Sequence, residues 1–228
     1  MKYGSIPAGG LGARLQPIGF SKELVPVSGR AVIEYLIERM VLAGIKKIFI
    51  NTAEDKADLI RYLASKSPHA EKFIFLVRPR RGLLDGVVLP EQFLREDDIL
   101  YFGLPDTIWY PKDGFVQVDK QPGELVLGLF DTGTPERFDS VVIDKKNKIQ
   151  SIKVKVKNPP SKWTWAIGKM TVKVARSLPH LSLFGESMNV YAQQQSAYAI
   201  ELKNSSCLDV GTLEDYSLAN QFVKNHEK

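Results

Sequence analysis

A glycine-rich loop followed by an arginine is the part of the chain best suited to chemistry. Gly9, Gly10 and Gly12 come directly after a short apolar run, and Arg14 follows them. Because glycine has no Cβ, backbone N–H groups in such a loop can approach phosphate oxygens closely, and an arginine can bind a phosphate through two parallel hydrogen bonds. The combination suits the triphosphate tail of a nucleotide. The alternative is a tight turn that carries a surface arginine, and the glycines alone leave both possibilities open.

The loop matches neither of two common nucleotide-binding fingerprints. When Gly10 and Gly12 are aligned with the Gly-x-Gly of a dinucleotide-binding loop, Leu15 stands where the third glycine is required. A Walker A loop is also excluded, because no Gly-Lys-Ser or Gly-Lys-Thr follows. Lys22, eight residues after Arg14, could bring a second positive charge to the same phosphates. An isolated lysine, however, is usually a solvated surface group.

The elements that must hold these residues alternate between strands and helices. Apolar runs predict strands over residues 3–7, 46–51, 73–77 and 99–102. Apolar residues at the i, i+3, i+4 spacing predict helices over residues 31–43 and 54–64. This βαβαβ order is typical of a parallel sheet. Asp106 follows the fourth strand, and ligands of open α/β sheets bind beyond the carboxyl ends of the strands.

The second half of the chain changes character. Strand patterns lie over residues 124–130, 140–144 and 149–156. They are joined by turns with few helix signals, so they predict an added β region that builds a second wall. Helical periodicity returns over residues 212–223, where Thr212 with Asp215 three residues later is typical of a helix start. We therefore expect a single domain over residues 1–228 with an α/β, Rossmann-like fold, whose mixed, mostly parallel sheet is flanked by helices.

Composition places the chain among ordinary globular proteins. Its 228 residues are 44% hydrophobic and 25% charged, which excludes a disordered or fibrous chain. The net charge of +5 suits phosphorylated ligands as well as nucleic acid. Because the basic residues form no recognised nucleic-acid-binding motif, we expect no nucleic-acid partner.

The cysteine content points to a reducing compartment, and the hydropathy pattern predicts no membrane-spanning segment. The single cysteine, Cys207, cannot form an internal disulfide and is predicted to be a buried structural thiol. No apolar run is long enough to span a membrane, and no signal-peptide core follows Met1. We therefore expect a cytoplasmic protein without a membrane partner.

Three motifs near the start of the chain resemble the sugar-phosphate nucleotidyltransferase family. They are Gly-Gly-Leu-Gly-Ala-Arg-Leu-Gln-Pro at 9–17, Lys-Glu-Leu-Val-Pro-Val at 22–27 and a helix ending in Ala-Gly-Ile at 43–45. Within the family they look like the glucose-1-phosphate thymidylyltransferases and UDP-glucose pyrophosphorylases. The chain departs from the family's pattern at Ala13, where the family has threonine, and at Ser21, where it has proline. The resemblance implies the nucleotide-diphospho-sugar transferase type of fold.

The resemblance also implies a nucleotide site around the glycine-rich loop. By similarity, Arg14 would bind the β- and γ-phosphates and Lys22 would steady the reacting α-phosphate, so these are the predicted catalytic residues. The predicted nucleotide-binding residues are Ala8, Gly9, Gly10, Gly12, Arg78 and Gly82. Ala8 and Gly9 would face the base. Arg78 and Gly82 belong to Arg-Pro-Arg-Arg-Gly-Leu at 78–83, which resembles the family's base and ribose segment and could otherwise be a basic surface loop.

Two aspartates fall in motifs that are similar to the family's acidic elements. Gly-Leu-Pro-Asp-Thr at 103–107 contains Asp106, and Cys-Leu-Asp-Val-Gly-Thr at 207–212 contains Asp209. Carboxylates are the hard oxygen ligands that Mg²⁺ needs when it also binds substrate phosphates. The resemblance therefore implies Mg²⁺ as the cofactor, with Asp106 and Asp209 as its ligands. Taken singly, each could be a turn-forming or helix-capping aspartate.

The acceptor side departs from the family's pattern. Residues 134–152 resemble the strand pair that precedes the family's Glu-Lys-Pro, but Val-Lys-Asn stands at 156–158. Val156 thus replaces the glutamate that would bind sugar hydroxyls, whereas Lys157 keeps the lysine that would contact the sugar phosphate. Lys157 and Gly168 are the predicted acceptor-binding residues. The neighbouring Trp165 could line the same pocket or fill the core.

The reaction implied by the resemblance is nucleotidyl transfer. A nucleoside triphosphate, with dTTP or UTP favoured, would react with a sugar 1-phosphate to give a nucleotide-sugar and pyrophosphate. Such chemistry needs positioning and charge neutralisation rather than an acid–base pair. The alternative is a regulatory homologue that binds a nucleotide or nucleotide-sugar but has lost turnover, which Val156 favours. The sequence leaves the sugar and the oligomeric state open.

Overall fold

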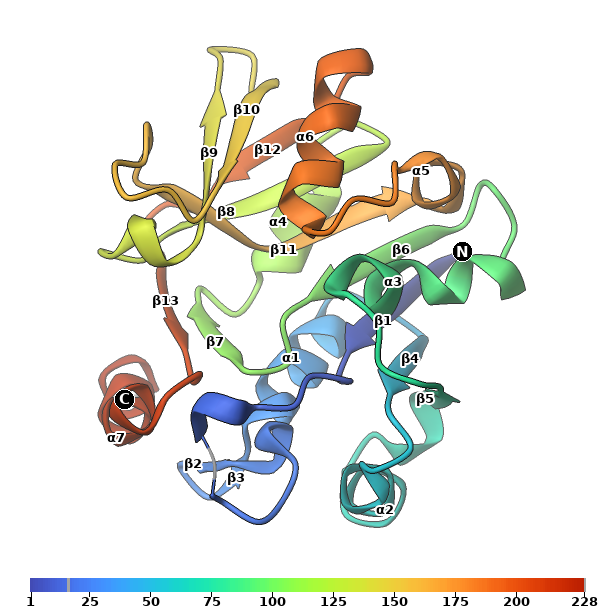
Figure 1. Cartoon of the computed structure of the whole chain (residues 1–228), viewed down its shortest axis with the longest axis vertical. Helices are drawn as coiled ribbons and strands as arrows, with labels where there is room; N and C mark the ends of the chain where they lie inside the picture. The colour runs from blue at the N-terminus through green and yellow to red at the C-terminus, as the bar shows by residue number, and fades with distance from the viewer. Residues whose placement is uncertain (16, 228) are drawn as a thin grey trace.

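The centre of the computed structural model is one nine-stranded mixed sheet (Figure 1), and the structure describes residues 1–15 and 17–227. The strands of this sheet are β1 (Lys2–Pro7), β4 (Lys47–Thr52), β5 (Phe73–Val77), β6 (Ile99–Gly103), β8 (Leu125–Asp131), β9 (Asp139–Ile143), β10 (Ile149–Val154), β11 (Trp163–Thr171) and β12 (Tyr198–Glu201). The main path runs β10-β9-β11-β6-β1-β4-β5, and β8 joins it by pairing with β11 and β12. The mixed sheet flanked by helices that the sequence predicted is confirmed.

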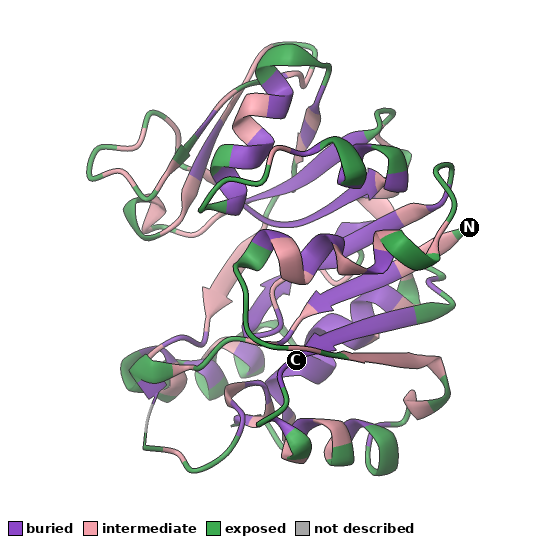
Figure 2. Ribbon diagram, turned by 45° about the vertical axis from the view of Figure 1, so that its right-hand side comes forward, coloured by how far each residue is buried: buried purple, intermediate pink, exposed green. Residues whose placement is uncertain are grey.

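Parallel strands make up one half of the sheet. β1 pairs in parallel with β4 on one side and with β6 on the other, and β4 pairs in parallel with β5. Parallel neighbours need crossover connections, and helices provide them. The connecting helices are α1 (Val32–Leu42), α2 (Ala57–Ser65) and α3 (Leu83–Val88). Figure 2 shows the strands at the middle of the sheet buried between covering helices, and the four strands predicted here are confirmed to within one residue at either end.

The other half of the sheet is the added β region. β11 joins it to the parallel strands, because it pairs antiparallel with β6, β8 and β9. The helices on this half are α4 (Gly114–Lys120), α5 (Val172–Ser177) and α6 (Phe184–Gln194). The strand predicted over residues 149–156 ends earlier, at Val154. Lys155 has a φ of 45°, and its N–H donates to the Phe138 carbonyl at 3.2 Å, so the extended ladder stops there.

Two short ribbons lie outside the main sheet. β7 (Thr107–Tyr110) pairs antiparallel with β13 (Ser206–Asp209), and β2 (Pro26–Val27) pairs with β3 (Arg30–Ala31). After β13 the chain enters α7 (Leu213–His226). The hydroxyl of Thr212 accepts a hydrogen bond from the Asp215 N–H at 3.1 Å, which confirms the predicted helix start.

Cys207 lies in β13 and is partly rather than fully buried. Its surroundings still raise the pKa of the thiol, chiefly through burial and then through the negative charge of Asp209. Among the helices of the described residues, none combines the length and the apolar character needed to cross a membrane.

Candidate active site

The carboxyl ends of four parallel strands open into one cavity of about 560 Å³. Its wall includes Pro7 at the end of β1, Thr52 at the end of β4, Arg78 after β5 and Asp106 beyond β6. A cavity of this size suits a small-molecule ligand, and ligands of open α/β sheets bind at this edge. The predicted site residues that line it are Gly9, Gly10, Arg14, Lys22, Arg78, Gly82, Asp106 and Asp209.

The glycine-rich loop lies against the side chain of Lys22. Gly12 has a φ of +67°, which glycine adopts readily, and a Cβ there would lie 2.9 Å from Lys22 Cβ. A Cβ at Gly10 would lie 3.4 Å from Lys22 Cε. The start of the loop is fixed to β4, because the Ala8 N–H donates to the Asn51 carbonyl at 2.8 Å. That N–H is therefore not free for a nucleotide, and Ala8 does not line the cavity. Its contact with the base stays a prediction.

Lys22 forms an ion pair with Asp106 inside the cavity. Lys22 begins a 3₁₀ turn (Lys22–Leu24), and Asp106 lies between β6 and β7. Burial by itself lowers the pKa of the Lys22 ammonium group. The carboxylates of Asp106, Glu23 and Asp209 outweigh burial, so the pKa is raised. Lys22 therefore stays positively charged at neutral pH, which suits the phosphate contact predicted for it.

The β7–β13 ribbon brings Asp209 next to Asp106. In the register of the ribbon Asp209 lies opposite Thr107, and the Val210 N–H donates to the Asp106 carbonyl at 2.7 Å. Burial, reinforced by the Asp106 carboxylate, raises the pKa of Asp209 to about 7. Two carboxylates that disfavour each other's ionisation gain from a cation placed between them.

This carboxylate pair fits Mg²⁺ when substrate phosphates complete the ligand set. Mg²⁺ is commonly held by one or two carboxylates together with the phosphates of a nucleotide. Within residues 1–15 and 17–227, no group of three His, Cys, Asp or Glu side chains could hold a metal ion alone. Gly211 leaves space at this corner, because a Cβ there would lie 2.6 Å from Asp209 Oδ2 and 2.9 Å from Arg14 Nη2. Arg14 therefore reaches the same corner as Asp209.

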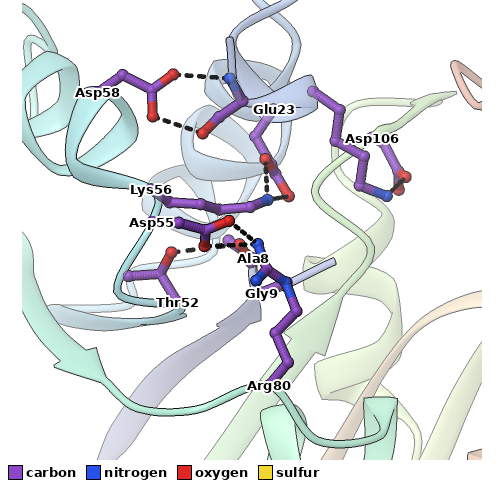
Figure 3. Close-up of polar contacts among 11 residues, drawn as sticks. Ala8, Gly9, Glu23, Thr52, Asp55, Lys56, Asp58, Arg80 and Asp106 are labelled. Atoms are coloured by element: carbon purple, nitrogen blue, oxygen red, sulfur yellow. Dashed lines mark hydrogen bonds and ion pairs between the residues drawn. The ribbon is translucent and has the colours of Figure 1, made fainter. Parts of the chain in front are cut away.

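A buried set of charged contacts holds the turn that carries Lys22 (Figure 3). The fully buried Glu23 accepts hydrogen bonds from Lys56 Nζ at 2.6 and 2.7 Å. Asp58 accepts hydrogen bonds from the Ser21 backbone N–H at 2.7 Å and from the Ser21 hydroxyl at 2.6 Å. Both contacts tie the Lys22 turn to the segment that begins α2.

The same segment also holds the glycine-rich loop, through Arg80. Asp55 pairs with Arg80, and Arg80 Nε donates to the Gly9 carbonyl at 3.0 Å (Figure 3). The predicted helix over residues 54–64 accordingly begins later, at Ala57, because a turn places Asp55 and Lys56 toward these partners. Residues 55–58 thus connect the glycine-rich loop, the Lys22 turn and the 78–83 segment.

Residues of the added β region line another side of the cavity. They are Glu136, Arg137, Phe138, Asp139, Lys155 and Trp165. The predicted Lys157 does not line it, because β10 ends at Val154 and Lys157 lies exposed beyond the turn. Gly168 does not line it either. A Cβ at Gly168 would lie 2.4 Å from Phe102 Cζ, so this glycine is required for packing inside the sheet.

A model of the nucleotidyl transferase family matches residues 4–226. The chain belongs to this family. A glucose-1-phosphate thymidylyltransferase of Neisseria meningitidis is 30% identical over 97% of this chain and 82% of its own length. The resemblance to sugar-phosphate nucleotidyltransferases is thereby confirmed.

Two solved structures resemble this nucleotidyltransferase over nearly its whole length. A Bacillus anthracis protein described as a glucose-1-phosphate thymidylyltransferase, solved with sucrose, gives a TM-score of 0.87 at 25% identity and covers 99% of this chain and 96% of its own. A UDP-glucose pyrophosphorylase complexed with UDP-glucose gives a TM-score of 0.85 at 17% identity and covers 99% of both chains. The second likeness shows the fold alone.

Sequence motifs of this nucleotidyltransferase predicted the cavity residues that follow the parallel strands, but not those contributed by the added β region. Arg137 and Asp139 flank Phe138 at the start of β9 and were assigned only to a strand pair. Charged residues placed directly before an apolar strand are the signal that could have found them. Arg137 also binds Asp215 at 2.9 Å, which ties the start of α7 to the cavity wall.

Proposed function

We propose that this nucleotidyltransferase couples a nucleoside triphosphate, with dTTP or UTP favoured, to a sugar 1-phosphate. The observation that carries the proposal is the convergence of Arg14, Lys22, Asp106 and Asp209 on one cavity at the carboxyl ends of the parallel strands. Family membership supports the reaction class, and the 30% identical relative is named a glucose-1-phosphate thymidylyltransferase. The products would be a nucleotide-sugar and pyrophosphate.

The triphosphate would be held by the glycine-rich loop and two cations. Arg14 would bind the β- and γ-phosphates, and Lys22 would exchange its bond to Asp106 for one to the α-phosphate. An anionic oxygen of the acceptor phosphate then forms a bond to the α-phosphorus, while the bond from that phosphorus to the leaving pyrophosphate breaks. No general base is needed, because the attacking oxygen carries no proton. The two cations stabilise the charge that the transition state spreads over the phosphate oxygens.

Asp106 and Asp209 would hold Mg²⁺ together with phosphate oxygens of the nucleotide. When bound, the ion would neutralise part of the negative charge of the triphosphate. Asp209, whose pKa is raised to about 7 in the protein alone, would bind the ion as the carboxylate. The carbonyl of Asp106 stays bonded to the Val210 N–H, so the backbone keeps the two carboxylates adjacent.

The nucleoside and the acceptor would lie on different sides of the cavity. Arg78 and Gly82 line it within the segment that Arg80 ties to Gly9, and we assign them to the nucleoside. Lys155 takes the role predicted for Lys157 and would bind the phosphate of the sugar. Its positive φ is rare outside glycine, and such conformations are concentrated at functional sites.

A pyrophosphate-release assay tests the proposal. Purified protein is incubated with Mg²⁺, each nucleoside triphosphate in turn and a panel of sugar 1-phosphates. Pyrophosphate release with at least one pair is the expected result. Nucleotide binding without turnover across the panel would instead favour the regulatory homologue, for which Val156 is the supporting feature. If the protein showed no nucleotide binding and no turnover, both functions would be contradicted.

A further inference from the structure

Asp139 presents to the cavity a carboxylate that the proposed phosphate chemistry does not use. It is the first residue of β9 and lines the cavity. Its Oδ2 accepts a hydrogen bond from Trp165 Nε1 at 3.1 Å. In the part of the chain that the structure describes, the other oxygen, Oδ1, has no hydrogen-bond partner. It is therefore available to a ligand.

The surroundings of Asp139 hold its carboxylate in place. Trp165 is only 5% exposed and packs against Phe102 and Phe184, with ring centroids 6.1 and 5.5 Å away, so the direction of its N–H is fixed. Gly185 of α6 supplies the space beside it, because a Cβ there would lie 2.4 Å from Asp139 Oδ2. Glycine is a poor helix former, and at this position its missing side chain leaves room for the carboxylate.

This carboxylate is short of polar partners. Across the β9–β10 pair Asp139 lies opposite Val154, and Phe138 precedes it. Burial raises the pKa of Asp139, although the Trp165 hydrogen bond and the positive charge of Lys155 oppose the rise. A partly buried carboxylate gains from each hydrogen-bond donor that a ligand brings to it.

We propose that Asp139 accepts hydrogen bonds from hydroxyl groups of the acceptor sugar and selects acceptors that carry them. The inference rests on the proposed function, which places the sugar on the Lys155 side of the cavity. One ligand can reach both side chains, because β9 begins with Asp139 and Lys155 directly follows its partner strand β10. Lys155 already supplies positive charge beside Asp139, so a neutral polyhydroxyl group fits better than an amine. Asp139 would thus provide a sugar-binding carboxylate although Val156 is apolar.

Calorimetric titration with Mg²⁺ present tests the inference. The Kd of dTDP is compared with that of dTDP-glucose, and the Kd of UDP with that of UDP-glucose, for wild type and Asp139→Ala. We expect the preference for the nucleotide-sugar to fall about tenfold in Asp139→Ala, while the Kd of the nucleoside diphosphate changes less than about twofold. An unchanged preference would overturn the inference. If Asp139→Ala fails to fold, Asp139→Asn takes its place and must lower the preference at least about threefold.

Nucleotide-sugars lacking one hydroxyl identify the group that Asp139 binds. Removing that hydroxyl should weaken binding to wild type but not to Asp139→Ala, because the two deletions remove the same hydrogen bond. Equal losses in both proteins for every hydroxyl would overturn the inference. Absence of turnover with every substrate pair would contradict the proposed function, yet an Asp139-dependent preference would leave this inference standing. Turnover combined with an Asp139-independent preference would overturn the inference alone.

Discussion

Lys22 and Asp106 form an ion pair at the point where we propose that the triphosphate binds. Their side chains are only 19% and 11% exposed, so the pair is shielded from water far more than an ordinary surface salt bridge. In the free protein each charge neutralises the other. A nucleotide with its metal ion must therefore offer both groups new partners at once.

Replacing Lys22 by methionine should make the protein more responsive to Mg²⁺. The substitution leaves Asp106 and Asp209 without the ammonium group that neutralises them, so a divalent cation gains more by binding. We expect Mg²⁺ to raise the melting temperature of Lys22→Met by about 4 °C more than that of wild type, measured by scanning fluorimetry. Pyrophosphate release should fall by about 10²-fold or more. Equal shifts of melting temperature in the two proteins would contradict the charge argument.

Asp106→Ala and Asp209→Ala should each remove Mg²⁺-dependent turnover. Each substitution takes away one of the two carboxylates assigned to the ion, and we expect losses of about 10²-fold or more in pyrophosphate release. Asp97→Ala is the matched control, because Asp97 is exposed and lies outside the cavity. Undiminished turnover in either cavity variant would show that its ligand assignment is wrong.

Lys56→Met should destabilise the fold strongly. The substitution leaves the fully buried Glu23 without its partner, which costs about 3–5 kcal/mol in comparable buried pairs. The double variant Glu23→Gln/Lys56→Met removes both charges and should recover about 1–3 kcal/mol of that loss. Urea denaturation of the single and double variants measures this coupling. Strictly additive losses would show that the two side chains do not stabilise each other.

Asp215 should make the stability of the fold fall as the pH decreases through the acid range. Burial by itself raises the pKa of Asp215, but hydrogen bonds from Arg137 and Thr212 outweigh burial, and the pKa is lowered. A carboxyl group of this kind stabilises the fold above its unfolded pKa of about 3.9, and the contribution disappears as the pH falls through the folded pKa. In urea denaturation, the stability difference between wild type and Asp215→Asn should be constant from about pH 5 to 7 and shrink below about pH 4. A difference that persists to about pH 2 would contradict this assignment.

The convergence on one cavity of the residues that we assign to the triphosphate could be predicted, because the glycine-rich loop and Asp106 directly follow strands. The glycine-rich loop leaves β1, and Asp106 follows β6 within a few residues, so the order of strands in the chain already places them at one edge. The apolar runs of the sequence located these strands to within one residue at either end. The sequence grouped Asp106 with Asp209 only because both lie in motifs that resemble the family's acidic elements. No local pattern predicts the pairing of β7 with β13 that brings them together.

Sequence position alone could not predict which residues line the side of the cavity that we assign to the acceptor. Strand periodicity does not show that β10 stops at Val154 or that Lys155 has a left-handed backbone conformation. The sequence therefore favours Lys157, whereas Lys155 is the lysine that lines the cavity. The sequence predicts Gly168 as an acceptor-binding residue, but its close packing against Phe102 explains the glycine. No sequence pattern predicts the pairing of Glu23 with Lys56, because charged residues are usually solvated and only the fold brings these two together.

The pairing of β7 with β13 also has a consequence for the order of events during synthesis. The glycine-rich loop, Lys22 and Asp106 all emerge from the ribosome in the first half of the chain, and the parallel strands beside them can pair at that stage. Asp209 is translated much later and reaches Asp106 only when β13 folds back onto β7. If Asp106 and Asp209 bind Mg²⁺ as we propose, a nascent chain would present its glycine-rich loop well before the two carboxylates assigned to the ion lie side by side.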